Sequence, residues 1–393
     1  MADTCDIAII GGGAVGSAAA YFLTSDPGFR GRVVVIERDP SYADCSTTRS
    51  AGAIRFQFST PENIRLSTFG MDFLDSVGER LEVEGDRPDV SYRRGRGYLF
   101  LASAAGLPVL AENHRIQRAE GADVALFSPV ELKGRFPWLN TNGIAMGSLG
   151  LSREGWFDPY ALLQALKRKA RAQGAVYLHD TVTGLERDGN RIAAVQLAGG
   201  GRLACGTAVN AAGHGAGKVA AMAGIPLAVG PRKRFVFVVD CRTPLPGCPL
   251  LIDSTGVWIR PEGASYVCGV SPPEDKDPEC DDFEIDYSEF ETVVWPTLAE
   301  RVPALESLKL QRAWAGHYDY NAIDQNGIIG RHPEVTNFLF ANGFSGHGIQ
   351  QSPATGRAIA ELIVHNKFVA IDLARFGYER FAANKPILEL NVV

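Results

Sequence analysis

The chain has 393 residues, of which 46 % are hydrophobic and 21 % are charged, so it can bury a sizeable core as one large or two interleaved domains. Its 39 Lys and Arg against 45 Asp and Glu give a net charge of −6, which leaves no basic surplus for a nucleic-acid partner. No stretch approaches the roughly 20 apolar residues that span a bilayer. The first predicted strand begins at Asp6, which leaves no room for a secretory signal, and we expect a cytoplasmic protein.

Cysteine and histidine usage predicts neither a disulfide framework nor a metal site. The seven cysteines are scattered and form no C-x-x-C pair, as expected of buried thiols in a reducing compartment. The seven histidines are equally dispersed and place no zinc-binding pair on one helical face. We therefore expect no metal.

The first forty residues predict a βαβ unit. Asp6 and the apolar residues 7–10 predict a buried strand, and the small and apolar residues after a glycine turn predict a helix over 14–23. A second apolar strand is predicted over 33–36. Parallel strands of this kind need a crossover helix between them, and the helix over 14–23 supplies it.

Residues 80–150 break this rhythm, with short strand patterns such as 98–101 between helical ones. An amphipathic helix is then predicted over 160–172. Further strands are predicted at 176–178, 182–185, 192–197, 235–239, 256–259, 266–270 and 337–341, and a last helix at about 353–364. The chain therefore predicts a dinucleotide-binding domain built from separated segments, with a second sheet domain inserted twice.

The glycine turn after the first strand carries the clearest motif. Residues 11–16 satisfy G-x-G-x-x-G, whose glycines allow a tight turn, close approach of the backbone to a pyrophosphate and close packing of the helix on the strand. Glu37 ends the next strand, where a carboxylate can accept hydrogen bonds from ribose hydroxyls. The alternative is a glycine-rich turn in some other βα unit, and the motif alone does not distinguish NAD from FAD.

A second glycine cluster, at residues 342–350, lies directly before the last predicted helix. Backbone amides at the start of a helix can face the edge of a flavin ring, which gains negative charge on reduction. The cluster therefore favours FAD, although an ordinary loop with an N-cap is the alternative.

Five segments of the chain resemble the D-amino-acid-oxidase superfamily of FAD enzymes: residues 11–16, 210–213, 314–319, 327–330 and 343–350. That group includes sarcosine and dimethylglycine oxidases or dehydrogenases, glycine oxidase and D-amino-acid dehydrogenases. The resemblance covers nearly the whole chain in the same order. The C-terminal third most resembles the FAD-dependent oxidoreductase-domain proteins linked to assembly of respiratory complex I.

The resemblance implies an α/β class, more fully an α+β two-domain flavoprotein, with a Rossmann-like FAD-binding domain and an inserted antiparallel-sheet substrate domain. The FAD-binding domain would comprise residues 1–80, 150–225 and 310–393. The substrate-binding domain would comprise residues 81–149 and 226–309.

The resemblance also implies which residues bind the cofactor. The ADP half would be held by Gly11, Gly13, Ala14, Val15, Gly16, Glu37 and Arg38. The adenine and the pyrophosphate channel would be lined by Val182, Ala212 and Gly213. The ring system would lie beside Ser46, Thr47, Arg49, Ser50, Ala51 and Gly52, with its edge at Gly316, Gly346, His347, Gly348, Ile349 and Gln350. Some relatives attach the flavin to a Cys near the position of Gly316 or a His near that of Arg49, so the resemblance implies non-covalent FAD.

The resemblance implies a substrate site at the flavin. Arg55 matches the arginine that clamps the substrate carboxylate in relatives, and a guanidinium can give two parallel hydrogen bonds to a carboxylate; the alternative is a structural arginine. Gln350 stands where sarcosine oxidases have a second carboxylate ligand, a lysine. His347 could titrate near neutral pH beside the flavin or a substrate amine. Tyr318 and Trp258 are candidate aromatic walls, with Trp258 equally compatible with a core position.

We therefore expect a flavoenzyme that oxidises the C–N bond of an amino acid or a secondary (N-methyl) amine by hydride transfer to flavin N5, after which water hydrolyses the imine. The electron acceptor would be O₂ or a respiratory-chain carrier, and the lack of a cation near Val267, where the oxidases have a lysine, disfavours O₂. The alternative is a flavoprotein assembly or interaction factor of the respiratory-complex type with little turnover. A third hypothesis is an NAD-dependent dehydrogenase that uses only the first glycine motif.

Overall fold

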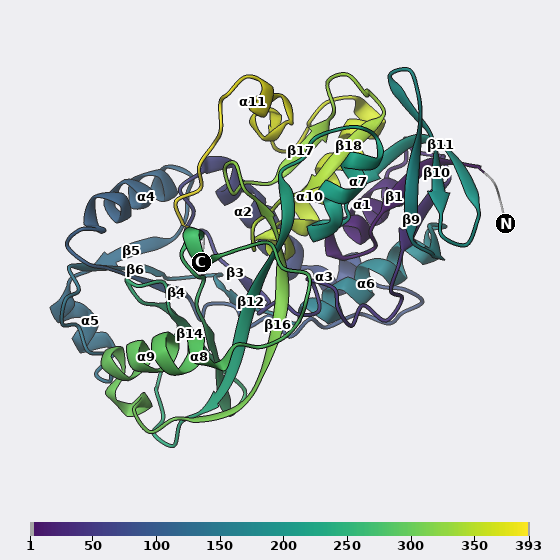
Figure 1. Ribbon diagram of the computed structural model, residues 1–393. Helices are drawn as coiled ribbons and strands as arrows, with labels where there is room; N and C mark the ends of the chain where they lie inside the picture. The colour runs from purple at the N-terminus through teal and green to yellow at the C-terminus, as the bar shows by residue number, and fades with distance from the viewer. Residues whose placement is uncertain (1–3, 392–393) are drawn as a thin grey trace.

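The structure, a computed structural model, describes residues 4–391. The ends of the predicted domain ranges, residues 1–3 and 392–393, lie outside them. The described residues form two eight-stranded sheets and a short two-stranded one. In Figure 1 the first sheet lies at the upper right with α1 and α10, and the second lies at the lower left with α5 and α9. The long strands β12 and β16 form the edge of the second sheet and run through the middle of the view.

The first sheet is mainly parallel and holds the predicted βαβ unit. Its main path runs in the order β17-β18-β11-β1-β2-β8, and all neighbours on it are parallel except β17 and β18. The antiparallel hairpin of β9 and β10 extends it from β11. The strands are β1 (Thr4–Ile10), β2 (Val33–Glu37), β8 (Val176–His179), β9 (Val182–Asp188), β10 (Arg191–Leu197), β11 (Arg202–Asn210), β17 (Ile328–Arg331) and β18 (Phe338–Asn342).

The second sheet is largely antiparallel, in the order β16-β12-β15-β14-β13-β4-β6-β5, with β13 and β4 as its parallel pair. The strands are β4 (Tyr98–Ala102), β5 (Val124–Phe127), β6 (Met146–Gly150), β12 (Val229–Asp240), β13 (Leu250–Ile252), β14 (Trp258–Glu262), β15 (Ser265–Gly269) and β16 (Lys309–Asn321). The two-stranded sheet pairs β3 (Ala53–Ile54) with β7 (Gly155–Trp156). The molecule is therefore a two-domain mixed α/β protein, as the sequence predicts.

The helices cover both sheets. They are α1 (Ala14–Ser25), α2 (Pro61–Asp75), α3 (Val77–Arg80), α4 (Leu107–Ala119), α5 (Pro129–Arg135), α6 (Pro159–Ala172), α7 (Ala216–Met222), α8 (Tyr287–Glu289), α9 (Trp295–Arg301), α10 (Gly348–His365) and α11 (Glu379–Ala382). Between residues 4 and 391, no helix is long and apolar enough to cross a bilayer.

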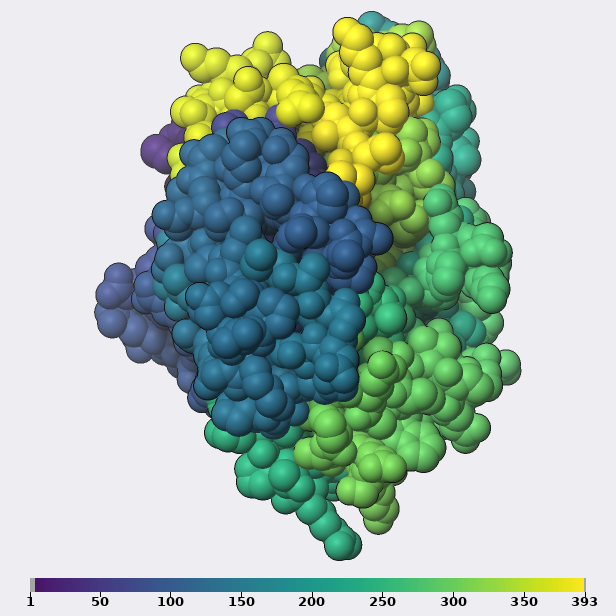
Figure 2. Space-filling view, turned by 90° about the vertical axis from the view of Figure 1, so that its left-hand side faces the viewer, coloured from purple at the N-terminus to yellow at the C-terminus, as the bar shows by residue number. Residues whose placement is uncertain are grey.

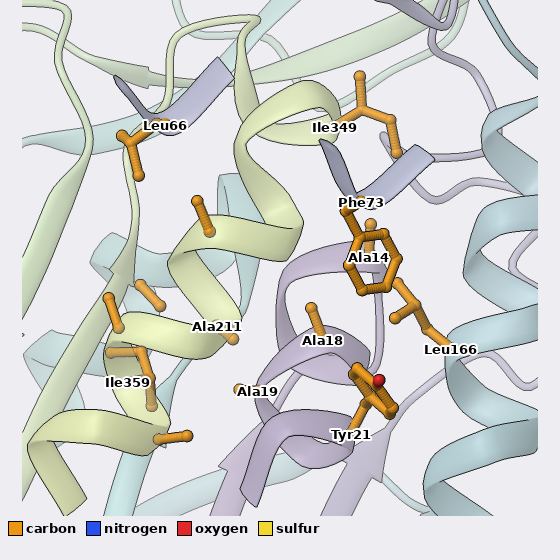
Figure 3. Packing of buried hydrophobic residues seen from close by; sticks show 14 of the residues in the cluster. Ala14, Ala18, Ala19, Tyr21, Leu66, Phe73, Leu166, Ala211, Ile349 and Ile359 are labelled. Carbon is orange, nitrogen blue, oxygen red and sulfur yellow. The ribbon is translucent and has the colours of Figure 1, made fainter. Parts of the chain in front are cut away.

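Helices α1 and α10, from opposite ends of the chain, pack directly on each other. The small side chains of Ala18 and Ala19 allow the close approach that Figure 3 shows. A Cβ on Gly356 of α10 would lie 2.4 Å from the carbonyl carbon of Ala18, so this contact needs a residue without a side chain. Residues at the N-termini of both helices line the same cavity.

The predicted strands and helices are present, and most boundaries differ by one to a few residues. The last helix is an exception, because α10 begins at Gly348 and carries Pro353 inside it, whereas the proline pattern predicts a start at 353. Pro353 has no N–H for the carbonyl oxygen of Ile349, and the Ser352 hydroxyl donates to that oxygen instead at 2.9 Å. This local substitution explains how the helix continues through the proline.

Two placements bear on the predicted domain ranges. Strand β16 pairs with β12 along the second sheet, although residues 310–393 are expected in the FAD-binding domain; the ranges stay a prediction. The last described residues turn back to the second sheet's side, where Asn391 accepts a 3.2 Å hydrogen bond from Asn113 of α4. In Figure 2 the end of the chain, in yellow, lies against the blue segment that contains α4.

Candidate functional site

The first glycine turn joins β1 to α1. Gly11 has a φ of +99°, and a Cβ there would lie 2.3 Å from the carbonyl oxygen of Ala211. A Cβ on Gly16 would lie 1.9 Å from the carbonyl oxygen of Gly11. Both positions therefore require glycine, and the turn opens the N-terminus of α1 to an anion.

Glu37 and Arg38 border this turn from the end of β2. The carboxylate of Glu37 accepts hydrogen bonds from the backbone N–H groups of Gly12 at 2.8 Å and Asp39 at 2.9 Å. Each of its oxygens has a second lone pair, which leaves acceptors for ribose hydroxyls. The guanidinium of Arg38 lies 3.2 Å from the imidazole of His214.

The second glycine turn, between β18 and α10, is fixed by a carboxylate. Asp319 Oδ2 accepts hydrogen bonds from the N–H groups of Gly343 at 2.8 Å and Phe344 at 3.1 Å. The carbonyl oxygen of Asp319 accepts a third, from Ser345 N at 3.1 Å. Burial raises the pKa of Asp319 to about 6. Sequence analysis gives Asp319 no role, and its place at the buried end of a strand is the signal that could have indicated one.

Gly346, in the same turn, packs against the ring of Tyr318 on β16. It has a φ of +99°, and a Cβ there would lie 2.5 Å from Cε2 of Tyr318. The ring of Tyr318 thus supports the backbone that leads into α10. The N-cap residues of α1 and α10 make no side-chain cap. The Ala14 N–H at the start of α1 donates to the Thr47 hydroxyl at 3.2 Å, and the N–H groups that follow it and those at the start of α10 can meet a ligand.

A single cavity of about 500 Å³ runs between the two glycine turns. Its lining includes every predicted cofactor residue except Gly16, which packs on Gly11 instead. These lining residues are Gly11, Gly13, Ala14, Val15, Glu37, Arg38, Ser46, Thr47, Arg49, Ser50, Ala51, Gly52, Val182, Ala212, Gly213, Gly316, Gly346, His347, Gly348, Ile349 and Gln350. The lining fits FAD, because one end offers a carboxylate and a glycine turn for the ADP half and the other offers the start of α10 for the ring.

Arg49 and Gly316 are neighbours in this lining. A Cβ on Gly316 would lie 3.1 Å from Cβ of Arg49. The guanidinium of Arg49 donates to the carbonyl oxygen of Ala315 at 2.8 Å, pairs with Asp44 at 2.6 Å and lies 4.2 Å from the ring of Phe283. The two positions at which some relatives attach flavin are thus adjacent, and neither carries a Cys or a His.

Arg55 lines the cavity beside His347, at the start of α10, and is 2 % exposed. Its guanidinium donates to the carbonyl oxygens of Gln57 and Asn391 and lies 3.1 Å from His347 Nε2. The ring of Phe58 lies 4.1 Å from it, and burial lowers the pKa of Arg55. Within residues 4–391, Arg55 makes no ion pair. The hydrogen-bond partners of its guanidinium are therefore all neutral.

The imidazole of His347 is neutral at this site. Because a guanidinium can only donate, Nε2 accepts from Arg55 and the ring proton is on Nδ1. Burial, with Arg55 nearby, holds the pKa of His347 well below its usual value. This differs from the expectation that it titrates near neutral pH. Gln350 is also engaged, since its Oε1 accepts from Arg55 N at 2.9 Å and from the Ser67 hydroxyl at 3.4 Å.

The remaining walls are aromatic. Trp258 and Tyr318 line the cavity, and their role as walls of a substrate site stays a prediction. Sequence analysis missed Tyr98, which lines the cavity from β4. Arg234 lies 4.9 Å from the ring of Tyr318 and is held by Asp277 at 2.7 Å. Arg234 is itself buried.

Glu154 is a second residue that sequence analysis missed. It is fully buried behind Arg55 and accepts hydrogen bonds from Phe56 N at 2.8 Å, Tyr98 N at 3.0 Å and Gln57 Nε2 at 3.1 Å. Burial raises the pKa of Glu154 to about 7. It lies in a loop without a motif, so no local pattern indicates it.

Comparisons with known proteins place these features in a family. The profile of the DAO family, described as FAD dependent oxidoreductase, matches residues 6–362. The FAD-dependent oxidoreductase domain-containing protein 1 of Xenopus laevis is 45 % identical over all of this chain and 85 % of its own length. The glycine oxidase of Bacillus subtilis is 25 % identical over 91 % of this chain and 93 % of its own length.

The solved structure of an L-proline dehydrogenase from P. horikoshii has the same fold. It superposes with a TM-score of 0.85 and 27 % identity, over 98 % of this chain and all of that one. The family match covers most of the chain and includes both glycine turns. This protein therefore belongs to the DAO family of FAD-dependent oxidoreductases.

Proposed function

We propose that this protein is a flavoprotein assembly or interaction factor of the respiratory-complex type, in which bound FAD stabilises the fold and turnover is low. The observation that carries the proposal is the difference in sequence identity between this chain and two kinds of relative. The chain is 45 % identical over its whole length to an FAD-dependent oxidoreductase domain-containing protein 1, against 25 % to glycine oxidase. The resemblance of the C-terminal third to proteins linked to complex I assembly names the kind of partner.

Two departures at the substrate end support low turnover. Gln350 stands where sarcosine oxidases have a lysine, and its amide oxygen is engaged by Arg55 N and Ser67. Val267, near the place of the oxygen-activating lysine, is 1 % exposed and packs with Val236 and Val238. The residues that relatives use for a second carboxylate contact and for O₂ are thus replaced.

The test is an anaerobic titration of the FAD-loaded protein with a panel of D-amino acids and N-methyl amino acids. We expect the oxidised flavin band at about 450 nm to persist and a respiratory-chain subunit to co-purify with the protein. Rapid bleaching by an amine would reject the low-turnover proposal. A cytoplasmic location stays a prediction, and cell fractionation would test it separately.

A second candidate function is oxidation of the C–N bond of an amino acid or secondary amine. The observation that favours it is that Arg55, Trp258, Tyr318 and His347 line the same cavity as both glycine turns. Bound FAD would supply the hydride acceptor, N5 of its ring, at that end of the cavity. The electron acceptor, O₂ or a respiratory-chain carrier, is left open in this proposal.

In this second function the chain's own residues bind and orient the substrate. The guanidinium of Arg55 would bind the carboxylate and so fix the α-carbon against the ring. Tyr318 and Trp258 would keep water from the reacting carbon. His347, which is neutral and accepts from Arg55, would hold the guanidinium in place and would not take a proton from the substrate.

A further inference from the structure

Glu154 is a buried carboxyl that contacts the loop on which Arg55 lies. It accepts from the N–H of Phe56, the residue after Arg55, and from the side chain of Gln57. It also accepts from the N–H of Tyr98, which lines the cavity from β4. One carboxyl group therefore ties together two segments that form the substrate end of the cavity.

The carboxyl group of Glu154 occupies the space that a side chain at position 150 would need. A Cβ on Gly150 would lie 1.8 Å from Glu154 Oε2, so the carboxyl group lies directly on a glycine. Gln57 completes the arrangement, since its amide donates to the Tyr98 carbonyl oxygen at 3.0 Å and accepts from the Ser148 hydroxyl at 2.7 Å. All these groups are buried, so a change at Glu154 is transmitted to Arg55 through fixed contacts.

We propose that Glu154 is a positioning residue, which holds Arg55 and Tyr98 at the substrate end of the cavity and couples the binding of a small carboxylate there to proton uptake. The inference rests on the second candidate function, in which Arg55 binds a carboxylate. An ionised Glu154 offsets the charge of Arg55 and repels a bound anion, whereas a protonated Glu154 leaves Arg55 as the local charge.

Other charged groups that face Arg55 and Glu154 do not replace this role. His347, on the α10 side, is neutral at and above neutral pH because its pKa lies well below its usual value. Burial raises the pKa of both Tyr98 and Tyr318, so these phenols stay protonated. Glu389, from the end of the chain, also favours the charged form of Arg55. It is held by Ser59 and Asn63 and is unchanged in E154Q, so it acts alike in both proteins. Burial also raises the pKa of Tyr92, a phenol that Glu154 influences, so Tyr92 stays protonated. Arg260 lies on the Tyr98 side and binds the carbonyl oxygen of Ala51 and the carboxylate of Glu262.

The experiment measures the affinity of the FAD-loaded protein for acetate between about pH 6 and pH 8.5. The shift of the flavin absorbance reports the binding. Because burial raises the pKa of Glu154 to about 7, the wild-type protein should bind acetate at least about fivefold more tightly at the lower pH. E154Q cannot ionise, so its affinity should be nearly independent of pH and should exceed that of the wild type at pH 8.5. E186Q, at an exposed carboxylate paired with Arg202, is the matched control and should behave like the wild type.

If the role of Glu154 is merely structural, E154Q should bind acetate more weakly at every pH, and its affinity should depend on pH as in the wild type. This result would overturn the inference but would leave the carboxylate site at Arg55 intact. Should E154Q fail to fold, calorimetry of acetate binding to the wild type in buffers of different ionisation enthalpy decides. Net proton uptake near pH 7 is expected, and its absence rejects the coupling.

If the wild type binds no acetate, or if R55M binds it as well as the wild type, the second candidate function itself fails and the inference fails with it.

Discussion

At the scale of single residues, Asp319 links a titratable group to the geometry of the cofactor turn. Its carboxylate receives two backbone N–H groups of the turn between β18 and α10, and burial raises its pKa from 3.8 to about 6. Folding therefore favours the protonated form. This contribution to the free energy of unfolding is fully present below about pH 4 and is lost as the pH rises through about 6.

D319N should remove this pH dependence, because an amide stays neutral while its oxygen can still accept from Gly343 and Phe344. Denaturant unfolding at about pH 4.5 and pH 7.5 measures the effect. The stability of D319N relative to the wild type should rise by about 1 to 3 kcal/mol between the two pH values. A difference that stays constant would show that Asp319 does not titrate in this range.

D319A tests the hydrogen bonds of Asp319 separately from its charge. Alanine leaves the N–H groups of Gly343 and Phe344 without their acceptor, which should cost about 1 to 3 kcal/mol of stability and weaken FAD binding. Fluorescence titration of the apoprotein with FAD is the measurement, with D319N as the matched control. Equal FAD affinity in D319A and D319N would contradict a role for these hydrogen bonds.

At the scale of elements, the start of α10 depends on a local exchange of hydrogen-bond donors. Pro353 removes the N–H that would reach the Ile349 carbonyl oxygen, and the buried Ser352 hydroxyl supplies a donor. S352A should therefore lower the stability by about 1 to 3 kcal/mol. The double variant S352A/P353A restores a backbone N–H and should recover most of that loss. Additive losses in a double-mutant cycle would contradict this account of the helix.

The β1–α1 turn gives a second prediction at this scale. In G16A a Cβ would lie 1.9 Å from the Gly11 carbonyl oxygen, so the turn must move, and we expect at least a tenfold loss of FAD affinity. The control is G134A in α5, where a Cβ meets nothing within 4 Å and helix propensity favours alanine by up to about 1 kcal/mol. Normal FAD affinity in G16A would show that this turn does not hold the nucleotide.

Local patterns predict the elements far better than the contacts between them. The apolar runs and the glycines of β1, α1 and β2 identify these elements because the signal lies within a few residues. The contacts of Arg55 come instead from distant segments, such as Asn391, 336 residues away. Glu154 meets Phe56 across 98 residues. Side chains fixed by such contacts carry no periodic signal, which is why Glu154 escaped detection.

At the scale of the whole molecule, two glycine turns more than 300 residues apart in the sequence meet at one cavity. Helix packing brings this about, since α1 and α10 follow the two turns and pack on each other at Gly356. A ligand that contacts both turns should stabilise the folded chain by an amount that grows with the logarithm of its free concentration above Kd. FAD should therefore raise the melting temperature, and free riboflavin, which lacks the ADP half, should raise it much less at the same concentration.

The most direct test of the central claim, that both turns hold one non-covalent FAD, is the absorbance of the purified protein before and after acid precipitation. We predict a yellow protein that releases about one FAD per chain into a yellow supernatant. A yellow pellet would contradict non-covalent attachment. A colourless protein that takes up no FAD would contradict the assignment of the cavity.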